Sequence, residues 1–337
     1  MTTIHDVARV AGVSISTVSY ALSGKRSVTA STRRRIEEAA RELDYRPNAG
    51  ARMLAGKRTY ILAVTEPVRA DTYAPAHMAF FLAVANAARR YDYDALLLTQ
   101  EEASAGLRRV TSSQLVDAVI VLDVSAHDER AVLARTLAIP SVFIGIPDNT
   151  DGLVCVDLDF VAAGRLAVDT LAEAGHRVIG LLGHPRSVYE RGSSFPPRFR
   201  DGFLRRAAKL GLEARFQMPD GDNSQTRTAL DALLGPDQDL TGLVMHCEET
   251  IQTFALEIVR ARGLQIPDDL SVISAATTAD TSRLDPPIDA IPLVPAHSCD
   301  RAVELAIEQL TQAAEPRVEL IAPTYTPFGS VAPRHAV

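Results

Sequence analysis

The 337-residue sequence lacks several features that mark common protein classes. It has no run of about 18 apolar residues, and its beginning, MTTIHDVARV, contains no apolar core of an export signal. Its three cysteines, Cys155, Cys247 and Cys299, are odd in number and far apart, which argues against a disulfide framework or a cysteine-based metal site. We therefore expect a reduced, cytoplasmic protein with no membrane segment, metal site or cofactor.

The composition is that of an ordinary soluble protein with more than one domain. Hydrophobic residues make up 47% and charged residues 23% of the chain, and the mean hydropathy is close to zero. Since a typical domain has roughly 100–150 residues, the length predicts two or three compact units.

Charge is distributed unevenly along the chain. Residues 1–58 contain 11 lysines and arginines against 5 aspartates and glutamates, a balance of +6, whereas the remainder carries −13. A basic segment attached to an acidic body predicts that the first segment binds a polyanion and that the body does not.

The pattern over residues 3–45 predicts three short helices that form a small domain. Thr3 and Ser14 are candidate N-caps of the first two helices, and Thr29 or Ser31 begins the third. The positions expected to face a thin core are Val7, Ala8, Ala11, Val18, Leu22, Ile36, Ala40 and Leu43.

The first two helices, with a glycine turn between them, form a helix-turn-helix pattern over residues 6–19. In this motif the N-terminal part of the second helix lies on base edges in the major groove of DNA. Hydroxyl groups and a tyrosine ring can reach bases or phosphates there, and nearby cations neutralise phosphates. The candidate DNA-contacting residues of this segment are Thr3, Ser14, Ile15, Ser16, Thr17, Ser19, Tyr20, Lys25, Arg26 and Thr29.

An ungapped resemblance to the headpiece and hinge of the LacI/GalR family of bacterial repressors covers TTIHDVARVAGVSISTVSYALSGKRSVTASTRRRIEEAARELDYRPNAGARML. It continues more loosely through VDLDF, LAEAGHRVIGLLG, FRDGF, DLSVI and APTYTPFGS. The resemblance implies a helix-turn-helix head joined by a hinge helix to two periplasmic-binding-protein-like lobes, which dimerise and bind an effector between them. It also implies that Ile15, Ser16 and Tyr20 are the main base readers, with Tyr20 in place of the usual arginine.

Pro47 separates the head from a short, alanine-rich segment. An isolated helix of fewer than ~12 residues is marginal, and this segment lacks a wide apolar face, so we expect a hinge that is helical only on DNA. The resemblance implies that Asn48, Ala51 and Leu54 contact the DNA, with Leu54 as an apolar wedge in the minor groove.

From Thr59 onward, apolar runs alternate with amphipathic segments, which is typical of parallel sheets covered by helices on both faces. The runs are YILAVT, ALLLT, AVIVLDV, SVFIGI, LVCVDL, VIGLLG, GLVMHC and SVISAA. The fold class expected is therefore α + α/β, with two doubly wound α/β lobes after the head. Taken with the resemblance, the expected domains are a head at 1–47, a hinge at 48–58, a first lobe at 59–158 and 291–320, and a second lobe at 159–290 and 321–337.

Candidate effector-binding residues follow from the resemblance and from the rule that open α/β sheets bind ligands at the C-terminal ends of their strands. They are Glu66, His77, Asp123, Gly145, Arg198, Arg200, Cys247, Glu248 and Ala276.

Several of these positions depart from the family's sugar clamp. Phe199 stands where the resemblance implies an arginine, which makes its neighbours Arg198 and Arg200 candidate substitutes. Cys247 and Ala276 replace polar ligands, and a free sugar needs several converging donors and acceptors. We therefore expect simple neutral sugars to bind poorly, and a larger or anionic metabolite to bind instead.

Histidine and cysteine residues of the second lobe also have structural interpretations. His176 and His184 lie at expected helix–strand turns, where polar caps are needed, so we interpret them as structural. Cys247 is interpreted as a small buried hydrophobic residue.

These features predict a sequence-specific DNA-binding transcriptional regulator, and we expect it to act as a repressor. It is expected to bind a pseudo-palindromic operator in double-stranded DNA as a homodimer, with a tetramer left open, under the control of a carbohydrate or other metabolite. One alternative is a regulator whose cleft receives a protein partner or no metabolite.

Two further alternatives are disfavoured. An enzyme with a DNA-binding appendage would need a catalytic signature, and the sequence contains no GxSxG, GxxxxGK[ST] or HExxH motif and no GxGxxG opening a helix. We therefore expect no enzymatic activity. A periplasmic sugar-binding protein would need an export signal and no basic head.

Overall fold

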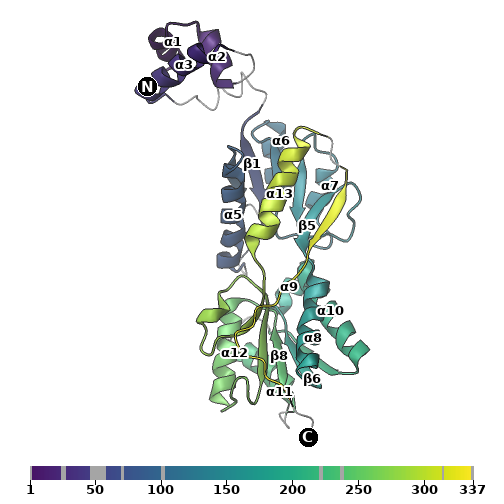
Figure 1. Cartoon of the computed structure of the whole chain (residues 1–337). Coiled ribbons are helices and arrows are strands. Elements are labelled where there is room, and N and C mark those ends of the chain that lie inside the picture. The colour runs from purple at the N-terminus through teal and green to yellow at the C-terminus, as the bar shows by residue number, and fades with distance from the viewer. Residues whose placement is uncertain are drawn as a thin grey trace.

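The structure, a computed structural model, describes residues 2–23, 28–45, 58–69, 72–99, 103–219, 223–235, 239–312 and 315–334. Figure 1 shows a three-helix head at the N-terminal end and two α/β lobes beyond it, with the C-terminus at the far end of the second lobe. The predicted DNA contacts that lie outside the described residues are Lys25, Arg26, Asn48, Ala51 and Leu54, and with them nearly all of the predicted hinge. None of the described helices is long and apolar enough to cross a membrane.

Three helices form the head: α1 (Ile4–Ala11), α2 (Ile15–Ser23) and α3 (Ala30–Glu42). The buried core consists of Val7, Ala8, Ala11, Val18, Ala21, Ile36 and Ala39. One predicted position was wrong by one residue, because Ala21 rather than Leu22 is buried in α2. The predicted Ala40 and Leu43 are partly buried and pack against this core, and Ala39 beside them is buried more deeply. Adjacent helical residues point about 100° apart, so a small shift in packing exchanges neighbours.

Local hydrogen bonds set the limits of α1. The Asp6 carboxylate accepts hydrogen bonds from the Thr3 hydroxyl at 2.8 Å and the Thr3 backbone N–H at 3.0 Å. These bonds lower the pKa of Asp6 to about 2. Gly12 ends the helix with a φ of +64°, in the left-handed region that glycine adopts without strain, and so turns the chain towards α2.

The first lobe is built on a six-stranded parallel sheet with the order β11-β5-β4-β3-β1-β2. Helices α5 and α13 pack on one face of this sheet, and α6 and α7 on the other. The strands are β1 (Ile61–Thr65), β2 (Asp94–Leu98), β3 (Ala118–Val121), β4 (Ser141–Ile144), β5 (Val154–Leu158) and β11 (Arg317–Ile321). The helices are α5 (Ala74–Arg89), α6 (Ala103–Ser112), α7 (Glu129–Ala134) and α13 (Pro295–Gln309).

The second lobe is built on a five-stranded parallel sheet with the order β10-β9-β8-β6-β7. Helices α8 and α10 cover one face, and α11 and α12 cover the other. The strands are β6 (Val178–Leu182), β7 (Glu213–Gln217), β8 (Gly242–Met245), β9 (Ser271–Thr277) and β10 (Asp289–Pro292). The helices are α8 (Phe160–Glu173), α9 (Arg186–Glu190), α10 (Phe195–Leu210), α11 (Asn223–Leu234), α12 (Glu249–Ala261) and the short η1 (Thr281–Arg283).

The chain crosses between the lobes after β5, after β10 and after β11. The last crossing returns to the second lobe, where the Asp289 carboxylate accepts hydrogen bonds from the N–H groups of Phe328 (2.6 Å), Gly329 (2.7 Å) and Ser330 (2.9 Å). Strands β10 and β11 extend one or two residues past the boundaries expected at 290 and 320.

Each of the eight apolar runs forms a strand, whereas no run predicted β7, β10 or β11. All three of these strands lie at sheet edges and have polar or short sequences: EARFQ, DAIP and RVELI. An edge strand has one neighbour and is less completely buried, so its sequence need not be continuously apolar.

Candidate DNA-reading helix and ligand cleft

The N-terminal end of α2 is fixed by hydroxyl groups. Ser14 precedes this helix, and its Oγ accepts a hydrogen bond from the Thr17 N–H at 3.2 Å. The same oxygen lies 2.8 Å from the Ser16 hydroxyl and 2.7 Å from the Thr17 hydroxyl. Ser16 is exposed and 41% of Ile15 is accessible, so this end of α2 presents both an apolar and a polar group to solvent.

The other described candidates for DNA contact lie close to these helix ends. Thr29 accepts a hydrogen bond from the Thr32 N–H at 3.3 Å and begins α3. Thr3 and Thr29 are exposed, while Ser19 and Tyr20 of α2 are half-buried. The arginines in the first turn of α3, Arg33, Arg34 and Arg35, are all exposed.

A cleft between the two lobes encloses about 1050 Å³, including its open mouth. The first lobe contributes the ends of β1, β3 and β4 and the start of α5, and the second contributes the ends of β6, β8 and β9. Of the predicted effector residues, the lining includes Glu66, His77, Asp123, Gly145, Cys247, Glu248 and Ala276.

Arg198 and Arg200 are not part of this lining. Arg198 forms an ion pair with Asp157, donates to the Ser194 carbonyl at 3.1 Å and lies 5.2 Å from the ring centre of Phe160. Arg200 binds its neighbour Asp201 at 2.8 Å and lies over the rings of Tyr189 and Phe216. Both guanidinium groups are therefore engaged by protein groups, and Asp157 lines the cleft in place of Arg198.

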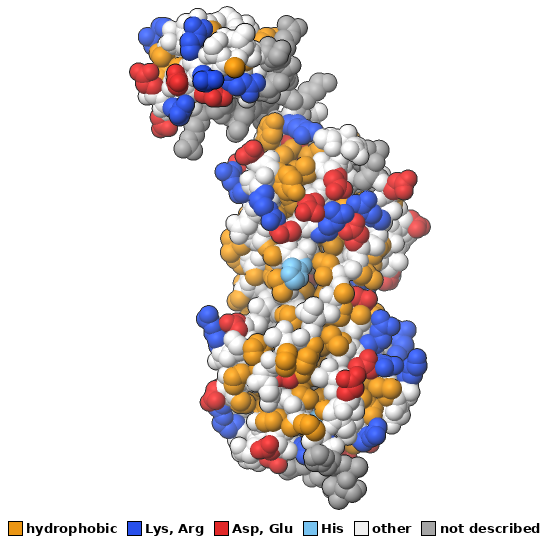
Figure 2. Space-filling view, in the orientation of Figure 1, with side chains coloured by type: hydrophobic (Ala, Val, Ile, Leu, Met, Phe, Trp, Pro, Cys, Tyr) orange, Lys and Arg blue, Asp and Glu red, His pale blue; other side chains and the backbone are white. Residues whose placement is uncertain are grey.

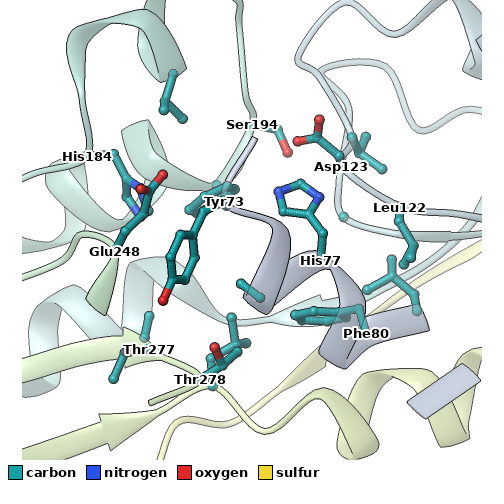
Figure 3. Close-up of a pocket in the computed structure, with 18 of the residues that line it drawn as sticks. Tyr73, His77, Phe80, Leu122, Asp123, His184, Ser194, Glu248, Thr277 and Thr278 are labelled. Atoms are coloured by element: carbon teal, nitrogen blue, oxygen red, sulfur yellow. The ribbon is translucent and has the colours of Figure 1, made fainter. Parts of the chain in front are cut away.

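Glu66 and His77 form a hydrogen-bonded pair on the first-lobe wall. Glu66 follows β1, and its carboxylate accepts from the Nδ1 of His77 on α5. Burial disfavours the charged imidazole, but the Glu66 bond and the negative charge of Asp123 outweigh it, so the pKa of His77 is raised. Figure 3 shows the His77 ring lying towards Asp123 and Ser194.

A buried arginine binds backbone carbonyl groups at the ends of β1 and β3 and so fixes these strand ends. Arg130 of α7 donates to the carbonyls of Thr65 (3.2 Å), Leu122 (2.8 Å) and Asp123 (2.8 Å), and it binds Asp128 at 2.7 Å. Asp123 adopts a φ of +47°, a left-handed conformation that few non-glycine residues adopt. Sequence reasoning did not identify Arg130, because its carbonyl partners are brought together only by the sheet.

Gly145 is required for close packing at the same edge. Its φ is +128°, and a Cβ at this position would lie 2.6 Å from the Cβ of Val124. A side chain here would displace the end of β4 from the strand beside it.

Aromatic side chains form much of the second-lobe wall. Phe160, Phe195 and His184 line the cleft, and His246 stacks on Phe199 behind them with ring centres 4.1 Å apart. Burial and the charge of Arg191 lower the pKa of His184 to about 3, and burial also lowers the pKa of His246. Both imidazoles are therefore neutral at pH 7 and behave as part of an aromatic surface.

The two histidines interpreted as structural differ in their surroundings. His176 is buried, with its Nδ1 2.9 Å from the Thr241 hydroxyl, whereas His184 lines the cleft. Cys247 is buried with a raised thiol pKa caused by burial, and it also borders the cleft.

Several contacts join the lobes around the cleft. The hydroxyl of Tyr73, which directly precedes α5, lies 3.3 Å from a Glu249 oxygen of α12, and the Ser194 N–H donates to the Val124 carbonyl at 3.1 Å. The Ala126 N–H donates to the Gly192 carbonyl at 2.7 Å. Figure 3 shows the Tyr73 ring beside Glu248, with its hydroxyl towards Thr277, and both of these residues belong to the second lobe. Any rotation of one lobe against the other must change these contacts.

Sequence reasoning missed much of the lining. Thr277 directly follows the run SVISAA, so the strand-end rule could have found it. Tyr73 and Arg191 come from segments without a periodic signal and reach the cleft only through tertiary packing. The lining residues not anticipated include Tyr73, Phe80, Asp157, Phe160, Arg191, Ser194, Phe195, Glu249, Thr277 and Thr278.

A helix-turn-helix head followed by a two-lobed body with an interlobe cleft defines a class of protein, the DNA-binding transcriptional regulators with an effector-binding domain. The family model described as bacterial regulatory proteins, lacI family, matches residues 3–48. The periplasmic binding protein-like domain matches residues 168–331.

Known proteins similar to this chain agree with that class. The HTH-type transcriptional regulator AglR of Rhizobium meliloti is 30% identical over 282 residues, which cover 80% of this chain and 76% of AglR. Catabolite control protein A of Priestia megaterium is 26% identical, with 86% of each chain covered. The chain belongs to the lacI family of bacterial regulatory proteins.

Solved structures share the fold over the whole chain. The lac repressor dimer bound to operator and the anti-inducer ONPF has a TM-score of 0.77 at 24% identity, covering 98% of this chain and 99% of that one. The complex of the transcriptional regulator CelR with cellobiose has a TM-score of 0.66 at 22% identity, covering 98% and 100%.

Proposed function

We propose that the protein is a repressor that binds a pseudo-palindromic operator in double-stranded DNA as a homodimer, and that a small molecule in the interlobe cleft controls this binding. The observation that carries the proposal is the presence in one chain of a helix-turn-helix head and a cleft at the strand ends of two sheets. The solved lac repressor, described as a dimer bound to operator, supports the same arrangement here.

The DNA-binding step is assigned to the head. Ile15 can make only apolar contact, such as with a thymine methyl, and Ser16 offers one hydroxyl, so each reads a base weakly alone. The exposed arginines at the start of α3 supply cations for phosphates. Figure 2 shows acidic and basic side chains interspersed over the visible face of both lobes, without the extended basic surface that DNA requires.

The homodimer is assigned to the first lobe. On α5, Met78 is 46% and Leu82 is 53% exposed, and Val294 beside the start of α13 is also exposed. Leu82, Ala79, Ala83 and Val294 line one shallow groove along these helices. Large apolar side chains gathered at one surface are typical of a protein–protein interface. A dimer with two-fold symmetry would place its two heads on the two half-sites of a palindromic operator.

The test begins with selection of DNA. Full-length protein is used to enrich bound duplexes from a random pool of DNA sequences. The affinity of the protein for the enriched duplexes is then measured by fluorescence anisotropy. We expect a two-fold symmetric site, with affinity that falls steeply as salt increases because phosphate contacts release counterions. An asymmetric site, or no enriched site, would contradict the proposal.

Effector control has a separate measurement. Metabolites that raise the thermal stability of the protein are added to the protein–operator complex, and the change in operator affinity is recorded. A ligand can shift DNA binding only through different affinities for two states of the body, so at least one stabilising ligand should change operator affinity.

A further inference from the structure

The cleft is lined by more acids than bases. Among the described residues, five carboxyl side chains and a single guanidinium, that of Arg191, belong to the lining. The acids are Glu66, Asp123, Asp157, Glu248 and Glu249. Ionised carboxylates only accept hydrogen bonds, so a ligand rich in donors complements this surface and an anion does not.

The arginines that bind Asp123 and Asp157 lie outside the lining. Arg69 binds Asp123 at 2.6 Å and Arg198 pairs with Asp157, but neither arginine belongs to the lining. Arg130 is held by Asp128 and by three backbone carbonyls. The carboxyl groups, rather than their arginine partners, therefore face the cleft.

Glu66 and Asp123 place acceptor atoms together at the first-lobe end of the cleft. They follow the paired strands β1 and β3, and each side chain is 6% exposed. The bond from His77 uses one Glu66 oxygen and the bond from Arg69 uses one Asp123 oxygen. Among the described residues, no hydrogen bond joins the second oxygen of either carboxylate, so each of these oxygens can accept a bond from a ligand.

The rest of the cleft is apolar and carries aromatic rings. Phe80 comes from α5, Tyr73 directly precedes that helix, and Phe160 and Phe195 come from the second lobe. Leu122 and Ile144 add apolar side chains from the first lobe. Aromatic faces bury a flat apolar body and also attract cations. Cys247 and Ala276, at positions where a sugar would need donors and acceptors, supply neither strongly.

We propose, building on the effector function proposed above, that the ligand of this cleft is an organic cation: a ring-sized apolar body with an ammonium group placed against Glu66 and Asp123. An ammonium carries three donors and no acceptor, which matches the two carboxylates. The anionic metabolite expected from the sequence depended on Arg198 and Arg200, and both are engaged elsewhere.

The test uses probes that share one body and differ in charge. Full-length protein is titrated by calorimetry with phenethylamine, phenethyl alcohol and hydrocinnamate, with the cyclohexyl analogues of all three, and with cellobiose. We expect each amine to bind at least about tenfold more tightly than its alcohol, because hydrogen bonds to charged groups contribute on that scale. The acids and cellobiose should bind more weakly still.

Two variants locate the ammonium. Asp123→Asn keeps a residue type that tolerates the left-handed backbone, and Glu66→Gln keeps the shape of the side chain. Each should reduce amine affinity by about tenfold or more and leave alcohol affinity unchanged. Glu257→Gln, on the exposed side of α12, is the matched control and should change neither. Thermal unfolding of all three variants establishes that they are folded.

If no amine binds more tightly than its matched alcohol, or if an acid or cellobiose binds best, the cation assignment is overturned. If the amine preference is present but unchanged in both cleft variants, the placement at Glu66 and Asp123 is overturned. Operator binding measured in parallel separates the two proposals: a neutral or anionic ligand that alters operator affinity would overturn this inference alone.

Discussion

The imidazole of His77 and the carboxylate of Glu66 form a partly buried hydrogen-bonded pair that joins helix α5 to the end of strand β1. Asp123 and Arg191 are the other charged groups that act on His77, and they shift its pKa in opposite directions. The net result is a pKa above the ordinary value of about 6.5. A group with a raised folded-state pKa stabilises the fold below its unfolded pKa, and this stabilisation is lost as pH rises through the folded pKa.

The first prediction follows from this pair. His77→Gln should lower the free energy of unfolding by roughly 1 to 3 kcal/mol in mildly acidic solution, since a hydrogen bond to a charged group is lost. The difference from the unmodified protein should shrink as pH rises through the pKa of His77. Denaturant unfolding at several pH values measures it, and His127→Gln is the control because 90% of that side chain is exposed. A difference that grows with pH would contradict a raised pKa for His77.

The second prediction compares two arginines on α10. Arg198→Ala leaves the Asp157 carboxyl without its cation, and burial already raises the pKa of Asp157. We expect a loss of about 3 kcal/mol at neutral pH, as for one partner removed from a buried pair, and a smaller loss in acid, where Asp157 is protonated. Arg200→Ala breaks a partly exposed pair with the neighbouring Asp201 and should cost under about 1 kcal/mol. Urea unfolding measures both variants, and equal losses of unfolding free energy would show that the Arg198 pair is no more important for stability than the Arg200 pair.

The third prediction concerns the homodimer. Leu82→Arg places a charge in the exposed apolar surface of α5, so the dimer should dissociate at micromolar concentration in sedimentation velocity. Val132→Arg is the matched control, because Val132 is 66% exposed on α7, on the opposite face of the sheet. A dimer that survives the first change, or that is lost with the second, would place the interface elsewhere.

The fourth prediction separates base reading from phosphate binding in the head. Tyr20→Ala should weaken binding to the selected operator by about 1 to 3 kcal/mol and change binding to random DNA little, because a base contact is lost. Arg34→Ala, in the exposed first turn of α3, should weaken both to the same extent and reduce the salt dependence. Fluorescence anisotropy on the two duplexes distinguishes the roles, and equal losses for Tyr20→Ala would exclude it as a base reader.

Sequence reasoning located the elements whose signals are local. The Thr3 and Ser14 caps, the Gly12 turn and the eight apolar runs all lie where helices end or strands form in the structure. These signals succeed because capping and buried-strand composition depend on residues close together in the chain. For the same reason the strand-end rule, together with the family resemblance, located Glu66 and Asp123 at the cleft, one and two residues past the ends of β1 and β3.

The sequence by itself determined the head, the two-lobed α/β body and the ends of the strands where a ligand cleft forms. Only the tertiary structure decided which charges face that cleft. Arg198 and Arg200 were equally good candidates in sequence, yet ion pairs hold both side chains outside the cleft lining. Arg191 and Tyr73 belong to the lining, although they come from segments with no periodic signal. The direction of a long side chain depends on partners distant in the chain, such as Asp157 for Arg198, and these become neighbours only when the lobes pack together.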